Sequence, residues 1–168
     1  MMKLAPTALG NFIAVIAYGH KDQLDKGSNP YILHLIRVML RLRTEDHELM
    51  MIAIGHDGLE DGVVTEWQLL DAGATPRVMA GLRLLNHDPA EPYQEYIERL
   101  CQNYDTIRVK IEDVRDNSDI TRTKPYDGDS VEGLIHHEQK QIKRIRKYQI
   151  AYKTLIEARK RFEILSGA

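Results

Sequence analysis

The sequence lacks the features that mark disulfide-rich, membrane-spanning and exported proteins. Among its 168 residues Cys101 is the only cysteine, which excludes an internal disulfide framework and suits a reducing, cytoplasmic environment. No apolar run approaches the ~20 residues that a helix needs to cross a bilayer. The segment 9–17 is mostly apolar, yet it lacks a preceding basic run and a following cleavage site. We therefore expect it to form a first helix, with no export signal and no membrane partner.

An excess of basic residues is also missing. Lysine and arginine number 23 against 25 acidic residues, and the net charge is -2. Proteins that bind nucleic acid or anionic membranes usually carry a large basic excess. We therefore expect no nucleic-acid partner, although a local basic pocket for a small phosphorylated ligand is compatible with this balance.

Helical spacing of apolar residues is what the sequence does have, and strand-like alternation persists nowhere. Thr65 with Gln68 three residues later, and Thr75 before Pro76, are typical helix starts. We expect helices that begin at Pro6, Thr65 and Pro76, and helices over 31–43, 45–57, 93–101, 105–120 and 130–165, the last capped by Asp129. The sequence thus predicts an all-α fold, a compact bundle of one domain over 1–168 with a long C-terminal helix.

Four polar side chains stand at positions that should be buried. His56 and Asp57 follow an apolar helix, where an unpaired carboxylate would be costly to bury. His34 and Asp113 lie within the apolar stripes of two other predicted helices. A divalent cation would offset the cost, and imidazole with carboxylate suits Mn, Fe, Zn or Co better than Ca or Mg. Together the four would leave coordination positions open for water and substrate.

Each of these residues also has a plainer interpretation. His34 alone could be a hydrogen-bonded core histidine. Asp113 could be an ion-pair partner of Lys110 or Arg115, and the pair at 56–57 could be the cap of a helix. The residues by themselves leave these alternatives open.

Three segments together resemble the HD-domain phosphohydrolases, and within them the hydrolase domain of RelA/SpoT-type alarmone enzymes and their small stand-alone relatives. Residues 30–34 are similar to the family segment Pro-Tyr-Ile-x-His, and residues 56–61 to His-Asp-x-x-Glu-Asp. Residues 109–117 are similar to Val-Lys-Leu-Ala-Asp-x-x-x-Asn. The segments occur in the family's order within 12–122, which would be the motif core of an HD-type domain.

The resemblance implies a site for one divalent cation, usually manganese. The implied ligands are His34, His56, Asp57 and Asp113. Glu60 and Asp61 would be the catalytic carboxylates that position and deprotonate water, and Lys26 and Asn117 would contact the substrate. A cation lowers the pKa of bound water toward neutrality, and a nearby carboxylate can then accept the proton. Without the resemblance, Glu60 and Asp61 could equally be surface residues of a turn beside Gly62.

Basic and aromatic residues outside the motifs offer further candidates. Arg122 is a candidate phosphate contact, with a surface arginine as the alternative. Tyr93 and Tyr96 could stack on a base or bridge core and solvent. The basic residues of 130–165 are interpreted mainly as a solvated face, and the apolar face of the same helix leaves a dimerising role, and hence a homo-oligomer, open.

The expected function is hydrolysis of a phosphoester or pyrophosphoryl group on a nucleotide, most specifically the 3′-pyrophosphate of a guanosine alarmone. The resemblance departs from the family at Asp25, where alarmone hydrolases commonly carry an arginine that contacts the substrate, and at Leu35, where a proline is usual. The alternatives are an HD-fold hydrolase of another nucleotide mono- or cyclic phosphate, and a nucleotide-binding sensor without turnover.

Overall fold

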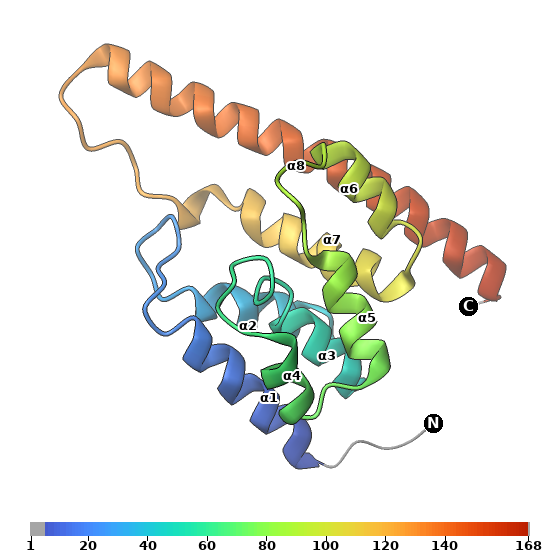
Figure 1. Ribbon diagram of the computed structural model, residues 1–168. Coiled ribbons are helices and arrows are strands. Elements are labelled where there is room, and N and C mark those ends of the chain that lie inside the picture. Colours follow the sequence, from blue (N-terminus) through green and yellow to red (C-terminus); the bar gives the residue numbers. More distant parts are fainter. Residues whose placement is uncertain (1–5, 168) are drawn as a thin grey trace.

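The computed structural model describes residues 6–167 and is helical almost throughout (Figure 1). Its helices are α1 (Pro6–Gly19), α2 (Ile32–Arg41), α3 (His47–Ile54), α4 (Glu66–Asp71), α5 (Pro76–Leu85), α6 (Tyr93–Leu100), α7 (Tyr104–Ser118), the 3-10 turn η1 (Ile120–Arg122) and α8 (Val131–Ser166). Within 6–167 no strand forms beyond a single isolated bridge between Leu24 and Pro30. The expected all-α fold with a long C-terminal helix is confirmed. No described helix combines the length and apolar character that crossing a membrane requires.

The helix starts follow local capping chemistry. Thr65 forms the expected capping box with Gln68, and Thr75 accepts a hydrogen bond from Val78 N at the start of α5. The predicted cap of α8 was one residue off, because Ser130 and not Asp129 accepts the bond from a backbone N–H of the first turn. The hydroxyl of Ser130 is 3.0 Å from the Gly133 nitrogen.

The predicted helix over 45–57 was too long, and the difference shapes the site. α3 ends at Ile54 with Gly55 as its C-terminal cap, and residues 55–63 form a series of turns. Gly55 packs so closely that an added Cβ would lie 3.0 Å from the Phe12 ring. His56 and Asp57 therefore lie in the turn beyond the helix, where neighbouring side chains are free of the ~100° separation that a helix imposes.

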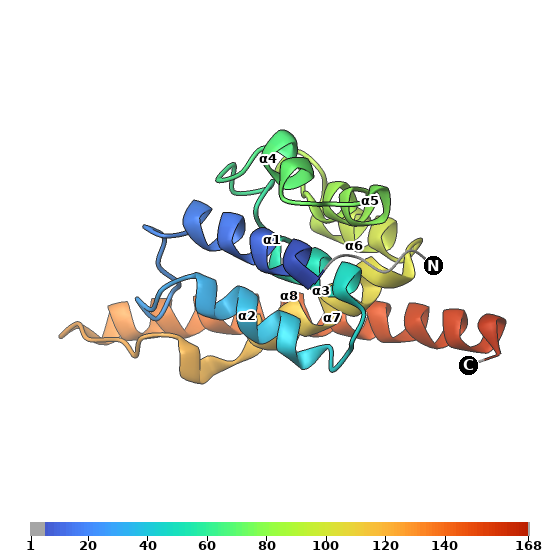
Figure 2. The same cartoon turned by 90° about the horizontal axis from the view of Figure 1, so that it is seen from below.

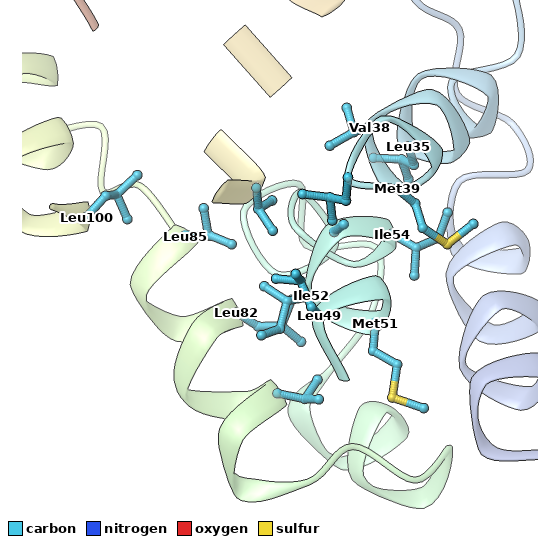
Figure 3. Close-up of a cluster of buried hydrophobic side chains, with 14 of the residues drawn as sticks. Leu35, Val38, Met39, Leu49, Met51, Ile52, Ile54, Leu82, Leu85 and Leu100 are labelled. Atoms are coloured by element: carbon cyan, nitrogen blue, oxygen red, sulfur yellow. The ribbon is translucent and has the colours of Figure 1, made fainter. Parts of the chain in front are cut away.

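The core is built around α3, which packs against α1, α2, α5 and α7. Five of its eight residues are buried. In Figure 3, leucine, isoleucine and methionine side chains of α2, α3 and α5 meet in one cluster, with Leu100 of α6 nearby. The two helices that carry His34 and Asp113, α2 and α7, also pack against each other and against α3. The core thus fixes the positions from which three separate segments reach one point.

α8 is far longer than the other helices, at 36 residues or about 54 Å. It packs along α7 and α6, and its first turns extend past the other helices, joined to α7 by 119–130 (Figures 1 and 2). Its fully buried residues, Ala151, Leu155 and Ala158, all lie in its C-terminal half. The N-terminal half is held less tightly and lies beside the site described next.

Candidate metal centre

Of the four predicted ligands, His34, His56 and Asp57 each offer a ligand atom within 4.8 Å of the other two, and Asp113 lies beside both histidines. His34 Nε2 lies 3.2 Å from Asp113 Oδ1 and 3.7 Å from Asp57 Oδ2. His56 Nε2 lies 3.1 Å from Asp57 Oδ2 and 3.4 Å from Asp113 Oδ1. Two ligand atoms bound to one ion at about 2.0–2.2 Å are about 3.0–3.5 Å apart, depending on the angle between them. Three of the four observed separations lie in this range, and the 3.7 Å between His34 and Asp57 is slightly longer.

The two imidazoles present free lone pairs to this cluster. Both Nε2 atoms are buried and make no hydrogen bond within the described chain, and both rings are 1% exposed. A buried polar atom without a partner is costly. A divalent cation removes that cost, so the donor set fits a metal ion.

The other ring nitrogens are occupied, which fixes the orientation of each ring. His56 Nδ1 donates to the carbonyl of Ala53, 2.8 Å away, and His34 Nδ1 lies 2.7 Å from Asp116 Oδ2. Burial alone would lower the pKa of His34, but the neighbouring carboxylates of Asp113 and Asp116 hold that pKa above its ordinary value. Proton and metal therefore compete for the same nitrogen.

Asp116 was not identified from the sequence. It is fully buried and accepts ion pairs from Arg37 at 2.9 Å, from Arg41 at 2.7 Å and, at very short range, from Arg122. Burial raises its pKa, but the bonds from His34 and Arg37 outweigh that effect and keep the pKa low. A carboxylate that holds a metal-binding histidine is a common supporting element. The indication in the sequence was that Asp116 follows Asp113 by about one helical turn and so lies on the same face of its helix.

The carboxylates of the site are also supported. Lys110 Nζ lies 2.8 Å from Asp113 Oδ2, so the ion pair considered from the sequence exists, while Oδ1 faces the histidines. Burial lowers the pKa of Lys110, but Asp113 outweighs that and raises it well above the usual value. Tyr31 donates to Asp57 Oδ2 at 2.6 Å, and Asn117 donates to Asp113 Oδ1 at 2.6 Å. Asn117 thus reaches the ligand shell itself.

A cavity of about 410 Å³ opens in front of Asp57 and Asp113. Glu60 and Asp61, the predicted catalytic carboxylates, both line it. The backbone N–H of His87 donates to Glu60 Oε2 at 3.3 Å, and Gln23 donates to Asp61 Oδ2 at 2.8 Å. Desolvation at the cavity edge raises the pKa of Glu60, and the nearby charge of Asp57 adds to this.

The cavity lining also contains the basic side chains of Lys26, Arg144 and Lys147, which we call the basic wall. Arg144 and Lys147 belong to α8; Lys147 is exposed, as the expected solvated face predicts, whereas Arg144 is half-buried. Lys147 Nζ lies 4.1 Å from the ring centre of Tyr93, and the hydroxyl of Tyr93 is buried without a partner. Two donors of the Arg144 guanidinium are also buried and unpartnered. These groups point to an anionic ligand with an aromatic or polar body.

Tyr96, the other tyrosine considered for stacking, is a core residue. It is 1% exposed and donates to the carbonyl of Leu85 at 2.7 Å. Burial raises its pKa to about 12.

Arg122 and Asp25 are paired with each other. Arg122 Nη2 lies 3.1 Å from Asp25 Oδ2, and its Nη1 is held by Asp116. Asp25 Oδ1 also accepts from the N–H groups of Gly27 and Asn29, each at 2.9 Å. Gly27 is required there, because an added Cβ would lie 2.4 Å from the Arg122 carbonyl oxygen. Arg122 lines the cavity, but its charge is already shared by two carboxylates.

No family model and no curated protein matches this sequence. Among solved structures, the chain is similar to a metazoan ortholog of SpoT, described as hydrolyzing ppGpp and playing a role in starvation responses. The TM-score is 0.61 and the identity 19%, over 94% of this chain and 98% of that one. A likeness at this identity establishes the fold. The chain therefore has the all-helical fold of that SpoT ortholog, in agreement with the family that the three sequence segments resemble.

Proposed function

We propose that this protein is a metal-dependent phosphohydrolase acting on a nucleotide, and specifically that it removes the 3′-pyrophosphate from guanosine 3′-diphosphate 5′-(di/tri)phosphate. The observation that carries this proposal is the meeting of two unpartnered imidazole nitrogens with two carboxylates that line a cavity also lined by basic side chains. The fold shared with a ppGpp-hydrolysing protein supports the choice of substrate.

One set of residues would hold the metal ion, and another supports that set. His34 Nε2, His56 Nε2, Asp57 Oδ2 and Asp113 Oδ1 would hold the ion, for which manganese is our first choice. Such a cation, when bound, offsets the charge of a phosphoester and lowers the pKa of adjacent water. Asn117, bonded to Asp113, fixes that carboxylate in place.

Glu60 is the proposed proton acceptor. It lines the cavity beside Asp57, and its raised pKa brings it closer to the range in which a carboxylate exchanges protons near neutrality. Asp61 is the proposed partner that orients water, and Gln23 holds one of its oxygens. Neither residue is occupied by an ion pair in the described chain, so both are available to the substrate.

The basic wall would bind the phosphates of the nucleotide. Lys147 and Arg144 present charge from α8, and Lys26 does so from the loop before α2. Tyr93 and Tyr148 offer ring faces for the base or sugar. Asp25 does not repel the phosphates, because its carboxylate accepts hydrogen bonds from its own loop and pairs with Arg122. The residue that replaces the family arginine is thus neutralised locally.

Manganese-dependent release of pyrophosphate from guanosine tetraphosphate tests the proposal. The purified full chain is incubated with the alarmone and, in parallel, with GDP, GMP and a cyclic nucleotide, with a Glu60→Gln variant as the matched control. Pyrophosphate release from the alarmone alone supports the whole proposal. Cleavage of another nucleotide instead would discard the substrate, and a metal-loaded protein inactive on all of them would discard hydrolysis.

A further inference from the structure

A second cavity, of about 900 Å³, is lined by the end of α2 and by residues of α7 and α8, and it shares Asp119 with the cavity at the metal centre. We call it the arginine cavity. Its charged lining consists of Arg41, Arg43, Arg108, Arg115 and Arg159 against two acidic residues, Glu112 and Asp119. Five positive and two negative side chains leave an excess of three positive charges. The lining contains no lysine.

Part of this charge is neutralised by ion pairs. Arg115 pairs with Glu112 at 2.7 Å and Arg159 with Glu163 at 2.7 Å. One oxygen of Asp119 is also engaged, because its Oδ1 accepts from the backbone N–H and the hydroxyl of Thr121.

Two arginines of the lining form no ion pair within residues 6–167, although the charge of Arg108 helps to lower the pKa of nearby Glu163. Within residues 6–167, neither Arg43 nor Arg108 has a carboxylate within 4.0 Å. Arg108 lies over the ring of Tyr104, 5.9 Å from its centre, where its guanidinium remains able to donate hydrogen bonds at the cavity.

The backbone of Arg43 adds a second observation. α2 ends at Arg41 with Leu42 as its cap, and Arg43 follows with φ of 47°, in the left-handed region. Helices that end this way usually place glycine at this position, because a side chain there strains the backbone. A cation suits the end of a helix, but Arg41 already supplies one in the last turn. Arg43 thus keeps a strained backbone conformation while its side chain lines the arginine cavity.

The chemistry of the lining selects one class of ligand. Guanidinium groups bind phosphate oxygens in pairs, and arginine is preferred over lysine where such paired binding is needed. Small-molecule pockets commonly enclose about 300–1,000 Å³, so the arginine cavity has room for a nucleotide. We propose that the arginine cavity is a second binding site, separate from the metal centre, for a ligand that carries a polyphosphate chain.

The test is a calorimetric titration of the full chain with inorganic triphosphate and, separately, with GTP. Arg43→Gly and Arg108→Ala remove the two unpaired charges. Arg41 is left unchanged because it also holds Asp116 beside the metal centre. Arg161→Ala is the control, an exposed arginine of α8 that lies outside the cavity. Lys147→Ala weakens any binding at the metal pocket, so that the remaining heat reports on the arginine cavity.

We expect Arg43→Gly and Arg108→Ala each to weaken the binding that survives Lys147→Ala by about tenfold, the usual loss for a charged hydrogen bond. Arg43→Gly should at the same time raise Tm by a few degrees, because glycine relieves the strained backbone. Weaker binding by a more stable protein cannot be attributed to misfolding. Arg161→Ala should bind as the unchanged chain does.

Comparing the affinities for inorganic triphosphate and GTP shows whether the site recognises a nucleotide or the phosphate chain alone. Tighter binding of GTP than of triphosphate would show that a nucleotide is recognised, with Tyr104 as the nearest ring. Equal binding would show that the phosphate chain alone is recognised, and either result supports the site. Affinities that are unaffected by Arg43→Gly and Arg108→Ala would overturn the proposal, as would the absence of measurable binding of either ligand.

Discussion

The two sides of the active-site cavity differ in how firmly the fold holds them. The metal wall, made of His34, His56, Asp57 and Asp113, comes from three segments packed on α3, and each histidine Nε2 lies within 3.7 Å of an oxygen of both carboxylates. The basic wall, made of Lys26, Arg144 and Lys147, comes from a loop and from the less buried half of α8. Metal binding needs fixed geometry, whereas charge attraction tolerates movement. Substitutions in the metal wall should therefore alter the reaction, and substitutions in the basic wall should alter the choice of substrate.

This comparison predicts that changes in the metal wall remove chemistry, whereas changes in the basic wall weaken only substrate binding. The predictions below test that separation, beginning with the largest expected effect.

Asp113→Asn should remove the metal and with it essentially all turnover, because the side chain supplies one of the four converging atoms. Asparagine keeps the shape of the side chain beside buried Lys110, so the helical circular dichroism should be largely unchanged. The metal content is measured after gel filtration, with Asp71→Asn on exposed α4 surface as the control. A variant that retains a full equivalent of metal would exclude Asp113 as a ligand.

Glu60→Gln should retain the metal and lower kcat by about 10²–10⁴-fold, the usual contribution of a general base. The amide keeps the size of the side chain but cannot accept a proton. Single-turnover rates with manganese bound would measure the effect. Turnover within threefold of the unchanged protein would assign proton transfer to another group.

Asp116→Asn should weaken metal affinity by about 10–100-fold without removing any ligand, because it loosens the orientation of His34. Titration against a competing chelator measures this loss. Raising the manganese concentration should restore much of the activity, which distinguishes a supporting residue from a ligand. Unchanged affinity would mean that packing alone orients the ring of His34.

Lys147→Ala should raise KM by about tenfold and leave metal content and kcat nearly unchanged, because it removes one phosphate contact. Lys153→Ala, on the same helix but outside the cavity lining, is the control and should leave KM unaltered. If Lys147→Ala lowered kcat as strongly as Glu60→Gln does, the two walls would not be separable, and the comparison would fail.

The sequence predicted the metal wall better than the basic wall, for a physical reason. His34, His56 and Asp57 stand in short motifs whose residue types are unusual at buried positions, so the anomaly is local and visible. Lys147 and Arg144 are two among many basic residues of a long helix, and only the docking of α8 on α7 decides which of them face the cavity.

Two further features depended on tertiary contacts. Asp116 has an ordinary helical setting, and its role arises because arginines of α2 and η1 meet it in the folded chain. The early end of α3 follows from the close packing of Gly55 against Phe12, which periodicity does not reveal. Periodicity and capping residues nevertheless predicted every helix, with errors of a few residues at the ends.

The uneven anchoring of α8 has a consequence for how a ligand enters. Local opening is easiest where few apolar groups are buried, and the buried residues of this helix, Ala151, Leu155 and Ala158, all lie past its midpoint. Backbone amides should therefore exchange hydrogen progressively faster from Leu155 back toward Val131. When the N-terminal half of α8 frays, Arg144 would move away from the cavity, and it would return when the helix forms again. One continuous helix would then serve as both structural support and gate, without a separate lid.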